Sequence, residues 1–276
     1  MPELPEVETL CTQLKKVILN KAIRDIKIFD PKLAMIDEAV GQKISDVTRR
    51  GKTLEIHLAP KRILKEIIRS SAGELHHKNV LVLHLRMSGR LLWQNDGEDL
   101  PAHTRFTIVF AKGRLVCIDP RRFATLVMRK DHPGGVVMDD PLKRCSPHQL
   151  SELTRNRRLP VKSFLMDQRI ISGIGNIYAC EILHAASVNP WRKVCGLSFR
   201  EWKGIAAAAK RILKRAVACR GTTVSDWRDL FGRKGEYQEE LSVYAREGHS
   251  CRRCHGLIER GCLSGRGTYF CPSCQK

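Results

Sequence analysis

Apolar residues recur every three to four positions near the start of the chain. Residues 5–20 read PEVETLCTQLKKVILN, and their apolar side carries Val7, Leu10, Leu14 and Ile18. Acidic residues come first and lysines last, which suits the helix dipole. The pattern predicts an amphipathic helix that buries one face and fixes the residues before it.

Short alternating apolar segments replace this pattern from about residue 22 to residue 129. Glycine, proline or charged residues separate them, as in an antiparallel sandwich or barrel. Residues 61–77 interrupt the alternation, and we expect an inserted short helix and polar loop there. The predicted strands include residues 23–29, 43–48, 53–58, 80–85, 107–110 and 114–118.

Helical spacing returns after a segment rich in Pro, Gly and Asp. Ser198, with Glu201 three residues later, predicts the start of the longest helix. The predicted helices are 147–156, 161–166, 177–186, 198–219 and 224–230. We therefore expect an α+β fold composed of an N-terminal antiparallel β-sandwich domain (1–130), a linker (131–146), a helical domain (147–240) and a metal-binding segment (241–276).

The net charge of the chain narrows the classes of partner that it is expected to bind. Lys and Arg number 49 against 29 Asp and Glu, a formal net charge of +20 among 276 residues. Such an excess points to a polyanion, and nucleic acid is the natural candidate. We expect no membrane partner, since no apolar run approaches the roughly 20 residues that spanning requires. The acidic first ten residues do not resemble a signal peptide, so we expect a protein that is not secreted.

Cysteine spacing at the end of the chain gives the strongest single signal. Cys251 and Cys254 form one C-x-x-C pair, Cys271 and Cys274 form another, and sixteen residues separate the two pairs. Four thiolates at this spacing predict one closed, structural Zn²⁺ site. A redox pair or two disulfides are the alternatives, which a reducing compartment disfavours. Between the pairs, residues 261–269 have the composition of a β-hairpin that presents Arg266.

Basic turns at strand ends are weaker signals. Residues 49–52 read RRGK, and Gly51 would let Lys52 reach a phosphate. Met87 lies near a second turn, and Arg121 and Phe123 lie in a third. Taken singly, these are solvated turns or core residues, but together in so basic a chain they suggest an edge that faces DNA.

A Gly-x-Gly loop at residues 173–175 leads into the helix that begins near Asn176. The free N–H groups of a helix start bind anions, so a DNA phosphate is the expected occupant. The loop lacks the third glycine of a dinucleotide site. A tight connection between two helices without a ligand is the alternative.

The first residues carry a candidate reaction centre. If Met1 is removed, Pro2 becomes a secondary amine that can attack an electrophilic carbon and form an iminium. Glu3 and Glu6 are then candidate proton donors or charge partners. The alternative is a frayed terminus that merely precedes a helix.

Six motifs in this order resemble those of the formamidopyrimidine-DNA glycosylase family: PELPEVE (2–8), RRGK (49–52), LRMSG (85–89), DPRRF (119–123), SGIGNIYACE (172–181) and GRGTYFCPSC (265–274). The resemblance runs from Pro2 to Gln275. It implies a helix–two-turn–helix domain, a zinc β-hairpin finger and duplex DNA bound in a cleft between the halves of the chain.

The resemblance also implies roles for residues. It implies a bifunctional glycosylase and abasic-site lyase of base excision repair, which removes oxidised purines such as 8-oxoguanine and formamidopyrimidines and then cuts the strand by β,δ-elimination. The implied catalytic residues are Pro2 (Schiff-base nucleophile), Glu3 (proton donor), Glu6, Lys52 and Arg266. The implied DNA-binding residues are Met87, Arg121, Phe123, Lys162, Asn176, Thr222 and Thr223.

Some features depart from the family pattern and leave alternatives open. The loop expected to close over the everted base has Gly232-Arg-Lys-Gly-Glu-Tyr237 where relatives commonly read GKPGYF. An endonuclease VIII-like glycosylase for oxidised pyrimidines is one alternative. A non-catalytic zinc-finger protein that binds DNA damage, or a redox-responsive zinc module, is another. We expect a cytoplasmic, nucleoid-associated protein of bacterial type that acts as a monomer.

Overall fold

The computed structural model describes residues 1–59, 79–129, 140–143 and 145–276. The chain forms two compact units, which we describe separately. The first holds residues 1–2, 7–134 and 226–233, and the second holds 3–6, 135–225 and 234–276. The expected insertion at 61–77 and most of the expected linker at 131–146 lie outside the described residues. The four-part division of the chain stays a prediction.

Helix α1 spans Leu4–Ile18 and confirms the first prediction. Its apolar stripe is fully covered, with Val7, Leu10, Leu14 and Ile18 each at most 1% exposed. From Val7 onward the helix belongs to the first unit, while its first turn belongs to the second. The residues around the candidate nucleophile are therefore held by a buried helix and are not a frayed end.

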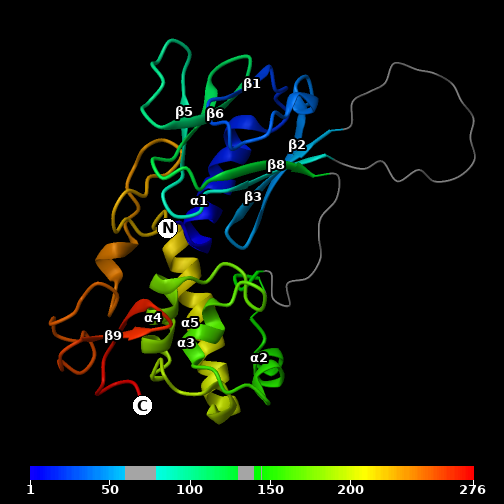
Figure 1. Ribbon diagram of the computed structural model, residues 1–276. Coiled ribbons are helices and arrows are strands. Elements are labelled where there is room, and N and C mark those ends of the chain that lie inside the picture. Colours follow the sequence, from blue (N-terminus) through cyan, green and yellow to red (C-terminus); the bar gives the residue numbers. More distant parts are fainter. Residues whose placement is uncertain (60–78, 130–139, 144) are drawn as a thin grey trace, which may run out of the picture. The chain divides into compact units, whose positions relative to one another are not determined.

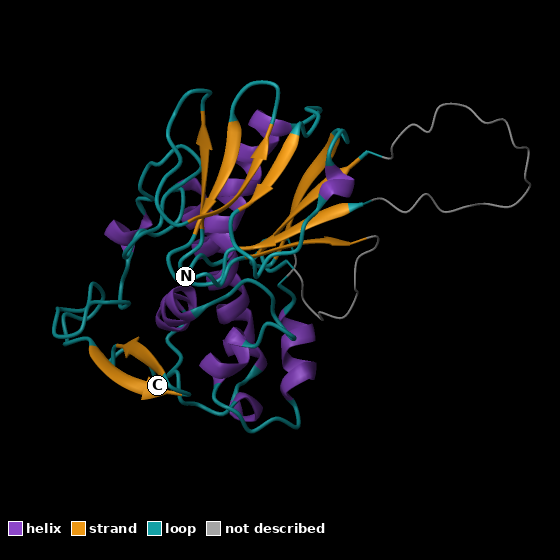
Figure 2. Ribbon diagram, turned by 45° about the horizontal axis from the view of Figure 1, so that its top comes forward, coloured by secondary structure: helices purple, strands orange, loops and turns teal. Residues whose placement is uncertain are grey.

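Two four-stranded antiparallel sheets make up most of the first unit (Figures 1 and 2). Alternating apolar residues of both sheets and of α1 share one core, as in a sandwich. One sheet has the order β1 (Asp25–Ile28), β6 (Thr104–Val109), β7 (Arg114–Ile118) and β5 (Arg90–Gln94). The other has the order β2 (Ile44–Arg50), β3 (Thr53–Leu58), β4 (Val80–His84) and β8 (Thr125–Arg129). The short helix η1 spans Asp37–Ala39.

The predicted helix over 224–230 is wrong, because no helix forms there. Residues 226–233 instead form an irregular segment that joins the sandwich core through Trp227 and Leu230. Gln13 of α1 fixes it, donating to Asp229 Oδ2 at 2.8 Å and accepting from the Leu230 N–H at 2.9 Å. Tertiary contacts thus replace the hydrogen bonds that a helix would have supplied.

Four helices form the core of the second unit: α2 (Pro147–Thr154), α3 (Val161–Met166), α4 (Asn176–Ala185) and α5 (Phe199–Ala218). Ser198 and Glu201 close the predicted capping box of α5. Short helices η2 (Val194–Gly196) and η3 (Tyr237–Glu240) complete the unit. Within the described residues, we find no helix with the length and apolar character that crossing a bilayer demands.

A two-stranded hairpin lies near the end of the chain, with β9 at Glu259–Leu263 and β10 at Arg266–Phe270. Ser264 and Gly265 form its turn, both with positive φ (49° and 70°), as a tight two-residue hairpin requires. The hairpin confirms the sequence prediction and places Arg266 directly after the turn. The expected α+β fold, with sandwich, helical part and four-cysteine hairpin, is confirmed.

Candidate active site and metal centre

The carboxylate of Glu3 occupies the N-terminus of α4. Its Oε2 accepts the Gly175 N–H at 2.7 Å, and its Oε1 accepts the Ile177 N–H at 2.9 Å. These are N–H groups that a helix start leaves without intrahelical partners, and they favour a negative charge. The side chain is buried, at 2% exposure, so its position is fixed from several directions.

The glycines of the 173–175 loop make this approach possible. A Cβ on Gly175 would lie 2.3 Å from Cδ of Glu3, and one on Gly173 would lie 2.7 Å from Cδ1 of Leu4. Gly173 also has a φ of +107°. The expected anion at this helix start is therefore not a DNA phosphate, because the chain's own Glu3 fills the position.

Glu6 lies one helical turn after Glu3 and is equally buried. Its carboxylate accepts from the Glu3 N–H (2.8 Å), the Tyr178 hydroxyl (2.7 Å) and the Thr222 N–H (2.7 Å). Burial, followed by the nearby charge of Glu3, raises the pKa of Glu6, and the hydrogen bonds from Tyr178 and the backbone only partly oppose this. Glu6 is therefore suited to holding a proton.

Pro2, the candidate nucleophile, is buried, whereas Met1 before it is 46% exposed. Thr222 is also buried, and its hydroxyl lies 2.9 Å from the Tyr178 hydroxyl. Thr223 accepts from the Gly235 N–H at 2.9 Å. Both threonines thus use polar groups within the protein, and their contact with DNA stays a prediction.

In the first unit, one buried aspartate ties together the two loops that carry the predicted wedge residues. Asp119 is fully buried and accepts from the Ser88 hydroxyl at 2.5 Å and from the Phe123 and Ala124 N–H groups at 2.7 Å each. Burial disfavours its ionisation, but the bonds from Ser88 and the backbone outweigh burial and lower the pKa of Asp119. The charged form therefore anchors both loops.

Ion pairs also hold these loops in place. Arg105 pairs with both Asp30 and Asp119, all three side chains being at most 3% exposed. Arg122 donates to Asp30 through Nε at 2.8 Å and through a second guanidinium nitrogen. Arg122 has a φ of +59°, an uncommon conformation for a residue with a side chain, and this pairing helps to hold it.

The supported loops present apolar side chains to solvent. Met87 is 48% exposed and Phe123 is 51% exposed, and the Arg121 guanidinium lies 6.0 Å from the Phe123 ring centroid. Large exposed apolar groups on a rigidly held loop mark a contact surface rather than a core. Met87, Arg121 and Phe123 thus lie on two loops that Asp119 joins. Their contact with DNA stays a prediction.

His84 and Lys52 lie at strand ends of the first unit. Lys52, expected to reach a phosphate, is only 7% exposed. His84 Nδ1 accepts the Arg86 N–H at 2.9 Å. Burial, with the charges of Arg86 and Lys52, lowers the pKa of His84 to about 4. The ring is therefore neutral, and the hydrogen bond that it accepts from Arg86 helps to hold the loop that leads to Met87.

In the second unit, the candidate phosphate contacts surround the hairpin. Lys162 is 1% exposed and donates to the Thr268 hydroxyl at 2.7 Å, and Asn176 donates to the Gly267 carbonyl at 3.0 Å. Burial lowers the pKa of Lys162. Arg266 is exposed. The three predicted residues therefore converge on β10, but Arg266 is the one that faces solvent.

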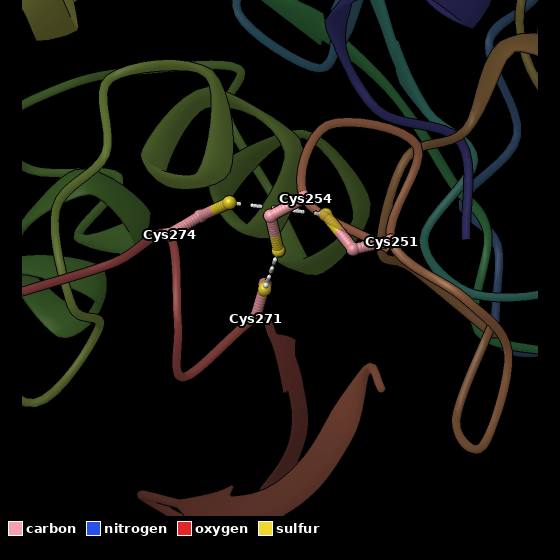
Figure 3. Close-up of side chains that lie close together, drawn as sticks. All are labelled: Cys251, Cys254, Cys271 and Cys274. Carbon is pink, nitrogen blue, oxygen red and sulfur yellow. Dashed lines mark hydrogen bonds between the residues drawn. The ribbon is translucent and has the colours of Figure 1, made fainter. Parts of the chain in front are cut away.

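Four cysteines form a candidate metal centre beside this hairpin. The Sγ atoms of Cys251, Cys254, Cys271 and Cys274 all lie within 4.8 Å of one another. Figure 3 shows their side chains turned toward one another. The Sγ–Sγ distance is 3.9 Å between Cys251 and Cys274 and 3.5 Å between Cys254 and Cys271. Tetrahedral bonds of 2.3 Å to zinc would place sulfurs about 3.8 Å apart. The donor set therefore fits one metal ion.

A histidine next to this centre completes its surroundings. His184, at the end of α4, places Nε2 3.5 Å from Cys251 Sγ. Such a neighbour orients a metal ligand. No local pattern pointed to His184, because it lies 67 residues away from Cys251 in the chain.

Comparisons with known proteins place these features in one family. The profile of the formamidopyrimidine-DNA glycosylase N-terminal domain matches residues 1–126, and that of the family's H2TH domain matches residues 138–227. The chain belongs to the formamidopyrimidine-DNA glycosylase family. A formamidopyrimidine-DNA glycosylase of Desulforamulus reducens is 36% identical over 100% of this chain and 99% of its own, and one of Xanthomonas oryzae pv. oryzae is 36% identical over 100% of both.

Solved structures agree with this assignment. The MutM (Fpg) protein from Thermus thermophilus has a TM-score of 0.84 at 33% identity, covering 99% of this chain and 98% of that one. The Lactococcus lactis Fpg in complex with DNA containing an abasic site has a TM-score of 0.83 at 27% identity, covering 99% of both. The expected enzyme class, a DNA glycosylase and abasic-site lyase of base excision repair, is confirmed. Neither the endonuclease VIII-like nor the non-catalytic alternative is favoured.

Proposed function

We propose that this enzyme excises oxidised purines from duplex DNA, with Pro2 as its nucleophile once Met1 has been removed. The observation that carries the proposal is the fixed carboxylate of Glu3, the residue that follows Pro2 in the chain. A secondary amine beside a buried carboxylate has a partner for the positive charge that an iminium carries. A terminus that served no chemical purpose would not need such a mount.

The proposed reaction follows from these groups. The Pro2 nitrogen attacks C1′ of the damaged nucleotide, and the bond from C1′ to the base breaks. The proton that the Pro2 nitrogen loses passes to the Glu3 carboxylate and from there to the ring oxygen, which opens the sugar and leaves an iminium between Pro2 and C1′. Loss of a C2′ proton then expels the 3′ phosphate, and a second elimination expels the 5′ phosphate. Glu6, with its raised pKa, lies one hydrogen bond from the Glu3 backbone and can store a proton nearby.

Met87 and Phe123 supply the wedge in this proposal. A base leaves the stack only if the lost stacking is replaced, and exposed apolar side chains on a rigid loop can occupy the vacated space. Arg121 would then contact the opposing base. Arg266, exposed after the hairpin turn, would bind backbone phosphate, and Lys52 would do the same after a rearrangement of its buried side chain.

The metal of the four-cysteine centre is proposed to be Zn²⁺. Four thiolates in tetrahedral reach suit zinc, and a centre without an open position would be structural. Bound zinc would join the two ends of the hairpin segment and hold Arg266 in place. Free thiolates persist in a reducing compartment, which supports a cytoplasmic location. The monomeric state stays a prediction.

Lesion choice tests the proposal. Excision by the purified enzyme should be at least tenfold faster on duplexes with 8-oxoguanine opposite cytosine than on duplexes with thymine glycol. Faster excision of thymine glycol would assign the enzyme to oxidised pyrimidines.

A further inference from the structure

A cavity of about 430 Å³ lies in the second unit, and its lining includes none of the residues of the proposed reaction. Its wall comes from α4, α5, η3 and the loop between Cys251 and Cys254. A volume between 300 and 1,000 Å³ is typical of sites for small molecules. Its lining carries three arginines (Arg211, Arg215 and Arg253) and two carboxylates (Glu181 and Glu240).

Two of the three guanidinium groups in this cavity have partners. Arg215 pairs with Glu240, with Nε at 2.8 Å from Oε1 and 3.1 Å from Oε2. Arg253 donates to the His184 carbonyl at 2.7 Å and to the Ser187 hydroxyl at 2.8 Å. These bonds fix both guanidinium groups at the wall of the cavity.

Arg211 differs from them. It lies on the exposed side of α5, one residue before the buried Ile212, and lines the same cavity. Across the described part of the chain, no hydrogen bond or ion pair to Arg211 is found. A guanidinium at the wall of a concave site, with five N–H donors and no acceptor of its own, is suited to an incoming anion.

The acidic groups do not cancel this charge. The Glu181 carboxylate already accepts the backbone N–H groups of Ser242, Val243 and Tyr244 at 2.9 Å each. Glu240 is held by Arg215. Three arginines against two carboxylates leave at least one net positive charge in the lining, which favours an anion.

We propose that this cavity binds a phosphate-bearing anion, with Arg211 as its main ligand. A planar guanidinium group binds phosphate with two parallel hydrogen bonds. A cavity lined only by carboxylates would not favour phosphate binding. The ligand has two possible sources, a free nucleotide or a terminal phosphate of a nucleic acid. Because Arg253 stands between two metal-ligating cysteines, an occupied cavity would also steady the cysteine loop. The inference does not depend on the proposed reaction.

Calorimetric titration of the metal-loaded enzyme tests this site. The probes are inorganic pyrophosphate, a nucleoside 5′-monophosphate and a short single-stranded oligonucleotide with or without a 5′ phosphate. We expect saturable binding of pyrophosphate to the wild type and at least tenfold weaker binding to Arg211→Ala. Lys210→Ala is the matched control, since it removes the same charge from the neighbouring exposed position, which does not line the cavity.

The outcomes separate cleanly. Tighter binding of the mononucleotide than of the phosphorylated oligonucleotide identifies a free nucleotide as the source, and the reverse order identifies a nucleic-acid end. Arg211→Ala should excise 8-oxoguanine at the wild-type rate, so failure of the proposed lesion choice leaves this test intact. No saturable binding to the wild type, or an equal loss in both variants, overturns the inference.

Discussion

The Gly175 N–H donates to the Glu3 carboxylate at 2.7 Å, across 172 residues of sequence. This bond joins the residue after the proposed nucleophile to the start of α4. It explains why a glycine occupies position 175, since any Cβ there would collide with Glu3. A loop that resembles a phosphate site in the sequence therefore holds the carboxylate of Glu3, the proposed proton donor.

Gly175→Ala tests this mount. The new Cβ would lie 2.3 Å from Glu3 Cδ, so we expect a loss of about 1–3 kcal/mol in the free energy of unfolding. We also expect at least a tenfold fall in single-turnover excision, because Glu3 must move. Gly196→Ala is the control, since nothing lies within 4 Å of a Cβ there. Equal activity of both variants would show that the position of Glu3 does not matter.

Tyr178→Phe tests the environment of Glu6. The lost hydroxyl removes a hydrogen bond to a buried carboxylate, which should cost about 1–3 kcal/mol of unfolding free energy. That bond lowers the pKa of Glu6, so its loss should raise this pKa further. A raised carboxyl pKa stabilises the fold below the unfolded value of about 4.5 and loses that contribution as pH rises.

Urea unfolding of both proteins between pH 4.5 and 8 measures this effect. The stability difference between wild type and Tyr178→Phe should widen as pH rises. A difference that stays constant across this range would mean that Tyr178 does not influence Glu6.

Asp119→Asn tests the support of the wedge loops. The change removes the charge opposite Arg105 and turns an amide N–H toward other donors, so we expect a loss of about 3–5 kcal/mol in unfolding free energy. Binding to lesion duplex should weaken as well. Asp25→Asn is the control, because its contact with Lys27 is an exposed pair at 4.0 Å. A variant as stable as this control would contradict the anchoring role.

His84 should make the stability of the fold depend on pH below 6.5. Its pKa falls from 6.5 in the unfolded chain to about 4 in the fold, so its stabilising contribution is complete above pH 6.5 and is lost as pH falls toward 4. The contribution is on the order of 1–3 kcal/mol. His84→Asn retains an acceptor for the Arg86 N–H but cannot titrate, and chemical unfolding should show a flatter profile between pH 6.5 and 4. An unchanged profile would exclude His84 as the cause.

The metal centre predicts about one equivalent of zinc per chain by elemental analysis. Cys254→Ser should lower the metal content, the thermal midpoint and the affinity for DNA together, because metal binding and folding of such a segment are coupled. Cys195→Ser, at an exposed cysteine outside the cluster, should change none of them. Full DNA affinity after complete removal of the metal would show that the centre is dispensable.

Local sequence patterns predicted much of this fold because their causes are local. Helix α1, strand β3, the capping box of α5 and the two C-x-x-C pairs each depend on residues close together in the chain. The helix prediction for residues 224–230 was wrong for the opposite reason, since Trp227 and Leu230 pack against residues far away in sequence. Its spacing resembled a helix, but distant contacts decided its structure.

The residues of the candidate site also differ in how far local sequence patterns predicted their positions. The motifs pointed to Glu3, Glu6 and the cysteines, but nothing in the spacing revealed that Glu3 would fill the helix start. Tyr178 and Asp119 were visible inside motifs without an assigned task. Their partners come from residues 31 and 172 positions away, which no local pattern encodes.

Borohydride trapping tests the central claim most directly. Reduction of the iminium should link the wild-type enzyme covalently to a duplex with 8-oxoguanine opposite cytosine, and peptide mass analysis should place the link on Pro2. Pro2→Gly should largely abolish trapping while leaving the thermal midpoint near that of the wild type. Equal trapping of the variant, or a link to a lysine such as Lys52, would contradict the assignment of Pro2 as the nucleophile.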